Sequence, residues 1–530
     1  MSFPLLTATA VLPAVGAIAT AAVPAKQRTA AKWLALLVSI GTLVLAAIVA
    51  VRFDPGGGRY QLTESHAWIA DFGVRYELGV DGIGVALVAL TALLIPFVIL
   101  AGWHDADPQD AADSRSVATG RWRPTQGFFA LILLVEAMVI ISFEATDVFL
   151  FYIFFEAMLI PMYFLIGGFG DRAGPHGEKE AATQRSYAAV KFLLYNLVGG
   201  LIMLAAVIGL YVVAGNFSLQ EIAEARANGS LDMATNTERW LFLGFFFAFA
   251  VKAPLWPLHT WLPNAMGEAT APVAVLITAV VDKVGTFAML RFCLQLFPEA
   301  SKWATPVILV LALISIIYGA LLAVGQRDIK RLVAYASISH FGFIIMGIFA
   351  MTSQGQSGAT LYMVNHGIST AALMLVAGFL ISRRGSRLIA DYGGVQKVAP
   401  VLAGTFLIGG LATLSLPGLA PFVSEFLVLV GTFTRYPVIG IIATFGIVLA
   451  ALYTLVLYQR TMTGPVKPST EGIADLRVRE LAVVVPLIGV LIFLGVYPKP
   501  LTELVNPAVK HTMSDVQKKD PKPEVEAAHK

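Results

Sequence analysis

Charged residues are scarce in this sequence, and cysteine is almost absent. Only 13% of the 530 residues are Asp, Glu, Lys or Arg, whereas 57% are hydrophobic; soluble domains carry about 25% charged residues. The single cysteine, Cys293, excludes a disulfide framework, an iron–sulfur cluster or a thiolate zinc site made by this chain alone. The net charge of +3 gives no indication of a nucleic-acid partner. The composition therefore predicts an integral membrane protein.

The sequence also lacks the motifs of common cofactor and metal sites. It has no Walker loop, no glycine-rich dinucleotide turn after a strand and no His-Glu-x-x-His metal pattern. No β-strand is predicted either, so the 47 glycines are interpreted as packing residues of membrane helices. We expect no cofactor and no metal in this chain.

Long apolar runs occupy most of the chain. A membrane-spanning helix needs about 20 predominantly apolar residues. Fourteen runs approach or exceed this length, near residues 4–22, 33–51, 79–101, 126–143, 147–170, 187–214, 240–258, 271–292, 304–324, 331–351, 357–382, 401–434, 438–462 and 480–497. The twelfth is interrupted and is taken as one broken helix, since two helices there would place the termini on opposite sides. The sequence predicts an all-α polytopic membrane protein.

The loops indicate an orientation for these helices. The first run lacks a preceding basic segment, so it is interpreted as a helix and not as a cleavable signal. Lys and Arg concentrate in the odd-numbered loops, as in Arg327, Lys330 and Arg331, and such loops are usually cytoplasmic. We expect both termini on the opposite side, with a polar and mobile tail from about Lys510.

The seventh and twelfth helices are interrupted by prolines. Pro254 and Pro257 break the seventh, and Pro417 and Pro421 break the twelfth. The breaks are five helices apart, and this odd offset reverses the direction of crossing, as in the inverted repeats of transporters. We expect a three-helix segment over 1–125, five-helix repeats over 126–292 and 304–462, a last helix over 463–509 and a tail over 510–530. The alternative is that prolines are simply frequent in membrane helices.

Lys252 is the most informative charged residue. It lies directly before the first break, and a lysine at the bilayer centre costs about 2.5–3.5 kcal/mol on insertion scales. Glu156 lies halfway along the fifth run, where an isolated carboxyl group would be neutral. Lys252 is the obvious candidate to keep Glu156 charged. A static buried ion pair is the alternative, although such pairs are often no more stable than apolar replacements.

Lys283, His340 and His366 lie inside the eighth, tenth and eleventh helices. A desolvated lysine exchanges protons readily; the alternative for Lys283 is a structural lysine that reaches the membrane surface. Its neighbour Asp282 points about 100° away around the helix, so the two need not face each other. Histidine titrates near about pH 6.5, which suits a proton relay. Hydrogen-bonded structural histidines are the alternative.

Carboxylates complete the set of candidates. Glu425 follows Pro421 by one helical turn and should face the second break, so we expect a second proton site there. Glu136 lies in the middle of the fourth helix. Glu144 and Asp147 are expected at a connecting turn, where solvation would explain their charge.

Around these positions the sequence resembles the antiporter-like membrane subunits of proton-pumping NADH–quinone oxidoreductase, respiratory complex I. The resemblance covers roughly residues 80–500 and is carried by FEAMLIPMY at 155–163, VKAPLWPLHTWLP at 251–263 and RLVAYASISH at 331–340. It implies that Glu156, Lys252, Lys283, His340, His366 and Glu425 form a hydrophilic axis that moves a proton. Glu425 stands where sister subunits usually carry lysine, which indicates one branch of the family. The segment 264–270 departs from the family's His-x-Glu-Ala-Pro pattern.

The resemblance implies a proton-translocating subunit in the bacterial inner membrane, with lipids and sister antiporter-like subunits as partners. It places FMN, iron–sulfur clusters and quinone in partner subunits. Subunits of Mrp-type sodium/proton antiporters and membrane-bound hydrogenases share these motifs, and a structural spacer that carries no protons is a third alternative. We expect protons and not sodium, because sodium needs several oxygen ligands, whereas the buried candidates are lysines and histidines beside isolated carboxylates.

Overall fold

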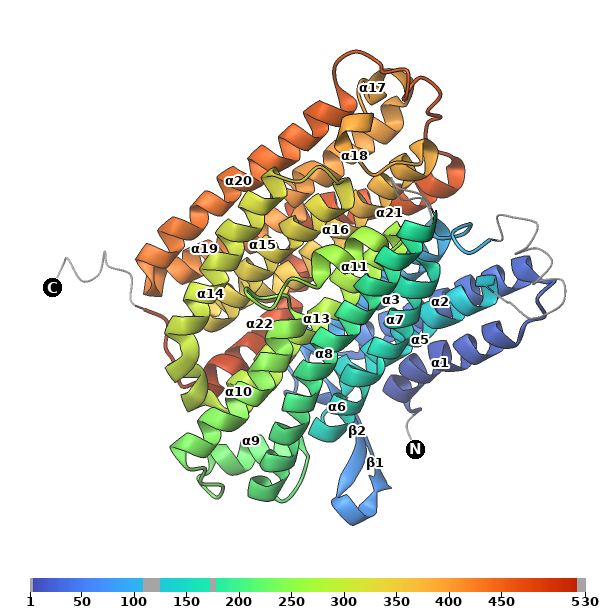
Figure 1. The fold of residues 1–530 in the computed structure, drawn as a ribbon. Helices are drawn as coiled ribbons and strands as arrows, with labels where there is room; N and C mark the ends of the chain where they lie inside the picture. The colour runs from blue at the N-terminus through green and yellow to red at the C-terminus, as the bar shows by residue number, and fades with distance from the viewer. Residues whose placement is uncertain (1–2, 108–123, 172–177, 522–530) are drawn as a thin grey trace.

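The computed structural model describes residues 3–107, 124–171 and 178–521. Long helices lie side by side in one bundle, with the first two at one flank and α20 at the other (Figure 1). Within the described ranges, twelve helical stretches are long and apolar enough to cross a membrane. Two further crossings are made by interrupted pairs of shorter helices, α10 with α11 and α18 with α19. The expected all-α polytopic fold is confirmed.

The first half of the bundle contains the first eight crossings. They are α1 (Leu5–Ala22), α2 (Arg28–Arg52), α3 (Gly82–Ala101), α5 (Pro124–Glu144), α6 (Val148–Ala157) continued by α7 (Leu159–Phe169), α8 (Glu178–Ala214), α10 (Thr235–Lys252) with α11 (Leu262–Glu268), and a composite eighth helix. The composite helix consists of α12 (Ala271–Val275), η2 (Leu276–Val281), α13 (Asp282–Ala288) and η3 (Met289–Leu294). The short α9 (Leu219–Ala227) lies in the loop between α8 and α10.

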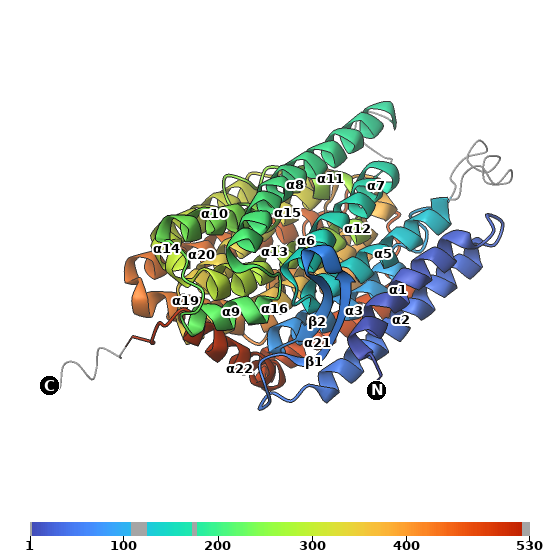
Figure 2. The same cartoon turned by 90° about the horizontal axis from the view of Figure 1, so that it is seen from below.

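The second half contains six crossings. They are α14 (Pro298–Val324), α15 (Ile329–Phe349), α16 (Ser353–Arg384), α18 (Pro400–Thr413) with α19 (Ala420–Arg435), α20 (Pro437–Met462) and α21 (Val478–Val496). The short η4 (Ile389–Asp391) and α17 (Val395–Val398) lie between α16 and α18, and α22 (Lys499–Asp515) follows the last crossing. In the view from below, α22 lies along one edge of the bundle (Figure 2).

Contacts between loops agree with fourteen alternating crossings. With the loops numbered in chain order, three isolated β-bridges each join two even-numbered loops or two odd-numbered loops. They are Leu78 with Ala145, Asp147 with Ser218, and Asp328 with Leu388. The first two join even-numbered loops, and the third joins the ninth and eleventh loops. The Lys330–Asp171 and Arg387–Glu268 ion pairs join odd-numbered loops in the same way. Each apolar run therefore crosses once, and the broken twelfth run counts as one crossing.

The prediction that the chain has no strands is wrong. Strands β1 (Gln61–Ile69) and β2 (Val74–Val80) form an antiparallel hairpin that projects from one end of the bundle (Figure 1). The turn is possible because Gly73 adopts a positive φ of 68°. Most of β1 is exposed or half-buried, so it lacks the apolar alternation that marks a strand in sequence. The third helix consequently begins at Gly82, after the strand ends.

Two further expectations are corrected. Glu144 and Asp147 are fully buried, so solvation does not explain them. Asp147 instead caps α6 by accepting from the Leu150 amide at 2.8 Å, and it also accepts from the Arg75 amide at 3.1 Å. The tail from Lys510 to residue 521 is ordered: α22 continues to Asp515, which forms an ion pair with Arg59. Residues 522–530 of the predicted tail lie outside the described residues.

Candidate functional site

Both predicted breaks are present, and neighbouring side chains satisfy their backbone groups. At the first, α10 ends at Lys252; Trp261 Nε1 donates to the Val251 carbonyl at 3.0 Å, and the Trp256 amide donates to Ser315 Oγ at 2.8 Å. At the second, Asn365 Nδ2 donates to the Ala420 carbonyl at 2.9 Å. Non-helical backbone is tolerated at membrane depth only where protein or a cavity provides such partners. The breaks are therefore built features of the bundle.

Lys252 and Glu156 lie on neighbouring helices but do not form a direct hydrogen bond. Lys252 Nζ donates to the Phe155 carbonyl at 2.6 Å and lies 3.6 Å from the centroid of the Phe155 ring. The Glu156 carboxylate lies against Gly200 of α8, where a Cβ atom would be 1.9 Å from Glu156 Oε1. The two side chains are therefore close enough to interact electrostatically, but each contacts a different part of the protein.

The composite eighth helix places Lys283 in the centre of the molecule. Residues 271–294 are all buried, and the two π-helical segments η2 and η3 flank α13. Such π-helical turns occur frequently at functional sites. Lys283 Nζ donates to the Thr278 carbonyl at 3.1 Å and lies 2.7 Å from His366 Nδ1. Lys283 is thus linked to the second half of the bundle through α16.

A second set of contacts continues from the histidines to Glu425. The rings of His366 and His340 are 5.3 Å apart between centroids. His340 Nδ1 lies 2.6 Å from the Tyr362 hydroxyl, which donates to Glu425 Oε2 at 3.1 Å. The Tyr453 hydroxyl oxygen lies 3.4 Å from His340 Nε2. Lys283, both histidines and Glu425 therefore form one polar series.

The sequence interpretation missed Tyr362, and it included Glu136, which lies apart from the polar series. Tyr362 precedes His366 by four residues on α16, so both lie on one helix face; this spacing was the available signal. Glu136 is fully buried in α5, and neither carboxylate oxygen has a hydrogen-bond partner among the described residues. Among the described residues, its carboxylate accepts no hydrogen bond from Lys252 or Lys283.

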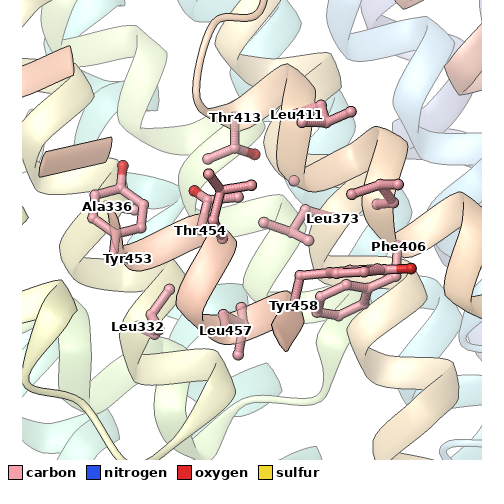
Figure 3. A pocket seen from close by; sticks show the side chains of 13 residues that line it. Leu332, Ala336, Leu373, Phe406, Leu411, Thr413, Tyr453, Thr454, Leu457 and Tyr458 are labelled. Carbon is pink, nitrogen blue, oxygen red and sulfur yellow. The ribbon is translucent and has the colours of Figure 1, made fainter. Parts of the chain in front are cut away.

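Two cavities lie within the described part of the bundle. A cavity of about 10 Å³, room for about one water molecule, lies beside the second break and is lined by Thr413, Tyr453 and Thr454 among apolar neighbours (Figure 3). A larger cavity of about 840 Å³ lies toward the odd-numbered loops and reaches Thr270 at the start of the composite helix. Asp105 also lines it; burial and then the charge of Asp171 raise the pKa of the Asp105 carboxyl to about 7. No group of three or more His, Cys, Asp or Glu residues suited to a metal ion occurs in the described ranges.

Comparisons with known proteins agree with this architecture. Residues 145–450 match the family described as NADH:quinone oxidoreductase/Mrp antiporter, transmembrane. NADH-quinone oxidoreductase subunit M of Mycobacterium tuberculosis is 56% identical over 541 residues, which cover 98% of this chain and 96% of that protein. A chain in the structure of respiratory complex I from Thermus thermophilus with bound NADH superposes with a TM-score of 0.83 at 30% identity, covering 96% of this chain and 99% of the other.

The fold is also shared with a chain of an Mrp complex. A chain of the Mrp complex from Dietzia sp. DQ12-45-1b superposes with a TM-score of 0.81 at 20% identity, covering 98% of this chain and all of the other. The resemblance inferred from the sequence is confirmed, and the branch indicated by Glu425 is the one whose members are named subunit M. This chain belongs to the transmembrane family of NADH:quinone oxidoreductase and Mrp antiporter subunits.

Proposed function

We propose that this chain translocates protons as an antiporter-like subunit of a proton-pumping NADH–quinone oxidoreductase in the bacterial inner membrane. The observation that supports this most is the series Lys283, His366, His340, Tyr362 and Glu425, which joins α13, α15, α16 and α19 through the buried centre of the bundle. Buried ionisable groups are expensive in a membrane and mark proton or ion pathways. The whole-length likeness to a protein named subunit M favours this assembly over the alternatives.

The proposed mechanism is switching of the Glu156–Lys252 pair. When the two side chains approach, Lys252 retains its proton, because the carboxylate stabilises the ammonium form. When they separate, Lys252 loses a proton toward Lys283, and Glu425 receives one by way of the histidines. The described arrangement fits the separated state, because Lys252 donates to the Phe155 carbonyl while Glu156 lies against Gly200. The two inverted repeats would then each provide one broken helix and one half of the path.

The energy has to come from partner subunits. Moving a proton against about 100 mV costs roughly 2.3 kcal/mol. Partner subunits that carry FMN, iron–sulfur clusters and quinone would supply this energy, and sister antiporter-like subunits would lie beside this chain. The large cavity supports proton uptake from the odd-loop end, because it reaches Thr270 and is lined by Asp105, whose pKa is raised by burial to about 7. The excess of Lys and Arg in the odd-numbered loops supports a cytoplasmic location for that end.

Substitution of the switch residues tests the proposal. We expect Lys252→Ala and Glu156→Ala to abolish or greatly reduce proton pumping while the complex still assembles. NADH-driven quinone reduction and vesicle acidification are measured together on the purified complex, with its subunit composition checked. Native pumping per NADH in both variants would reject the coupling role and favour a structural spacer.

Transport of sodium instead of protons is the alternative to test, because a chain of an Mrp complex shares this fold. Lys252 and Lys283 repel a bound cation whenever they are protonated, so we expect protons to be carried. Reconstituted complex is assayed in sodium-free and sodium-rich media with a protonophore. Sodium-22 uptake that depends on NADH and survives the protonophore would establish sodium as the transported ion. Identification of the other chains in the native assembly distinguishes complex I from an Mrp antiporter or a membrane-bound hydrogenase.

A further inference from the structure

Asp282 is a buried carboxylate that has no role in the proposed proton path from Lys252 through Lys283 to Glu425. Its side chain is fully buried, and neither oxygen has a hydrogen-bond partner among the residues that the structure describes. A buried polar group without a hydrogen-bond partner destabilises the folded state, and it does so more strongly when it is charged. A cost of this kind at the centre of the bundle indicates a function beyond packing.

Asp282 lies on the face of the composite helix that packs against the first break. Gly285, three residues further on, shares this face. A Cβ at Gly285 would be 2.9 Å from the Ala253 amide nitrogen and 3.0 Å from the Phe249 carbonyl, so the helix packs directly on the end of α10. Lys283 points away from this face and meets His366 on α16. Neighbouring residues of one helix therefore face the two halves of the bundle.

Charges of opposite sign alternate through this contact. Lys252 interacts electrostatically with both Glu156 and Asp282. Asp282 in turn interacts with both Lys283 and Lys252. The order Glu156, Lys252, Asp282, Lys283 thus places one carboxylate between the two lysines.

A static counter-ion does not fit this geometry. A permanent partner of a lysine would accept one of its hydrogen bonds, but Lys252 donates to the Phe155 carbonyl, and Lys283 donates to the Thr278 carbonyl and contacts His366. Both Asp282 oxygens remain available to receive a proton. The fully buried Glu144 is also unpartnered within the described chain, but it has neither lysine beside it.

We propose that Asp282 carries the proton from Lys252 to Lys283, an inference that rests on the proposed proton translocation. In the first step an N–H bond of the Lys252 ammonium breaks and an O–H bond forms on the Asp282 carboxylate, through hydrogen-bonded water. In the second step that O–H bond breaks and an N–H bond forms on neutral Lys283. The carboxylate is regenerated, and one positive charge has moved from the first half of the bundle to the second.

The test compares Asp282→Asn, Asp282→Glu and the matched control Glu144→Gln in the assembled complex. Asparagine keeps the size of the side chain but cannot hold the proton, so we expect pumping per NADH to fall several-fold. Asp282→Glu should recover most of the pumping, and Glu144→Gln should remain near native. Native pumping in Asp282→Asn together with its loss in Lys252→Ala would overturn the relay alone. Native pumping in Lys252→Ala as well would instead overturn the proposed function.

Infrared difference spectra of the complex during turnover separate a relay from a structural role. A relay requires a carboxylic-acid C=O band that is lost in Asp282→Asn, shifted in Asp282→Glu and retained in Glu144→Gln. If Asp282→Asn does not assemble, the shift in Asp282→Glu still tests the assignment. A spectrum without any band that depends on residue 282 would overturn the proposal.

Discussion

His340 Nδ1 and the hydroxyl oxygen of Tyr362 lie 2.6 Å apart, and the same hydroxyl donates to Glu425 Oε2 at 3.1 Å. A tyrosine hydroxyl has one proton to donate. Since that proton points to Glu425, the hydroxyl oxygen accepts from His340 Nδ1. His340 Nε2 is then free to accept from Tyr453, as the 3.4 Å contact indicates. Tyr362 is thus the group that connects the histidines with Glu425.

Tyr362→Phe should interrupt this connection with little change in packing. We expect pumping and coupled turnover to fall by about tenfold or more, since positioned proton-transfer groups contribute about 10²–10⁴-fold. Vesicle acidification and NADH oxidation are measured with and without an uncoupler. Tyr458→Phe is the control, because Tyr458 lines the small cavity on the same helix as Tyr453 without belonging to the series. Native pumping in Tyr362→Phe would show that protons bypass the tyrosine.

Gly200→Ala should displace the Glu156 carboxylate. The added Cβ would be 1.9 Å from Oε1 and 2.1 Å from Cδ of Glu156, far inside van der Waals contact. Alanine is favoured over glycine in a helix interior by about 1 kcal/mol, so we expect an assembled complex whose pumping resembles that of Glu156→Ala. Gly404→Ala on α18 is the control, because a Cβ there meets no atom within 4 Å. Equal pumping in both alanine variants would mean that the position of Glu156 is not important.

Glu425→Gln should impair turnover, whereas Glu425→Asp should be partly tolerated. Glutamine can still accept the hydrogen bond from Tyr362 but cannot store a proton, while aspartate can titrate from a shorter side chain. Turnover and protons pumped per NADH are compared across a pH series for the three proteins. A fully active glutamine variant would show that Glu425 is a polar packing residue.

The stability of the hairpin junction should depend on pH through Asp147. Burial raises the pKa of this carboxyl from 3.8 to about 6, against the opposing effect of the amide hydrogen bonds. The folded state therefore binds the proton more tightly than the unfolded state, and the contribution to stability that is present below about pH 4 is lost as pH rises through about 6. The rise in the Asp147 pKa from 3.8 to about 6 corresponds to roughly 3 kcal/mol of folding free energy.

Asp147→Asn should make this pH dependence smaller. Asparagine retains one acceptor for the Leu150 amide but loses the bond to Arg75, so we expect a drop of about 1 kcal/mol that does not vary with pH. Melting temperatures of the purified complex between pH 4.5 and 7.5 provide the measurement. An unchanged slope in the variant would exclude Asp147 as a source of the pH dependence.

Much of the architecture could be predicted from the sequence because membrane insertion depends on local composition. The fourteen crossings, the two proline breaks and the burial of Lys252 and Lys283 all follow from runs of apolar residues and from what interrupts them. The hairpin and α22 could not be predicted in this way. Their residues are mostly polar or exposed, and their order depends on contacts such as Arg59 with Asp515, far apart in the chain.

The identities of the candidate residues came from the sequence, but their connections are tertiary. Helical periodicity shows which residues share a face, yet it does not determine which other helix that face meets. Packing of α16 against α19 joins Tyr362 to Glu425. Packing of the composite helix against α10 places Asp282 beside Lys252. Gly200 of α8 provides the space that the Glu156 carboxylate occupies. A proton path depends on distances between residues that lie as many as 97 positions apart in the chain. The sequence therefore determined which groups can titrate, and only the packed bundle decided which of them can exchange protons.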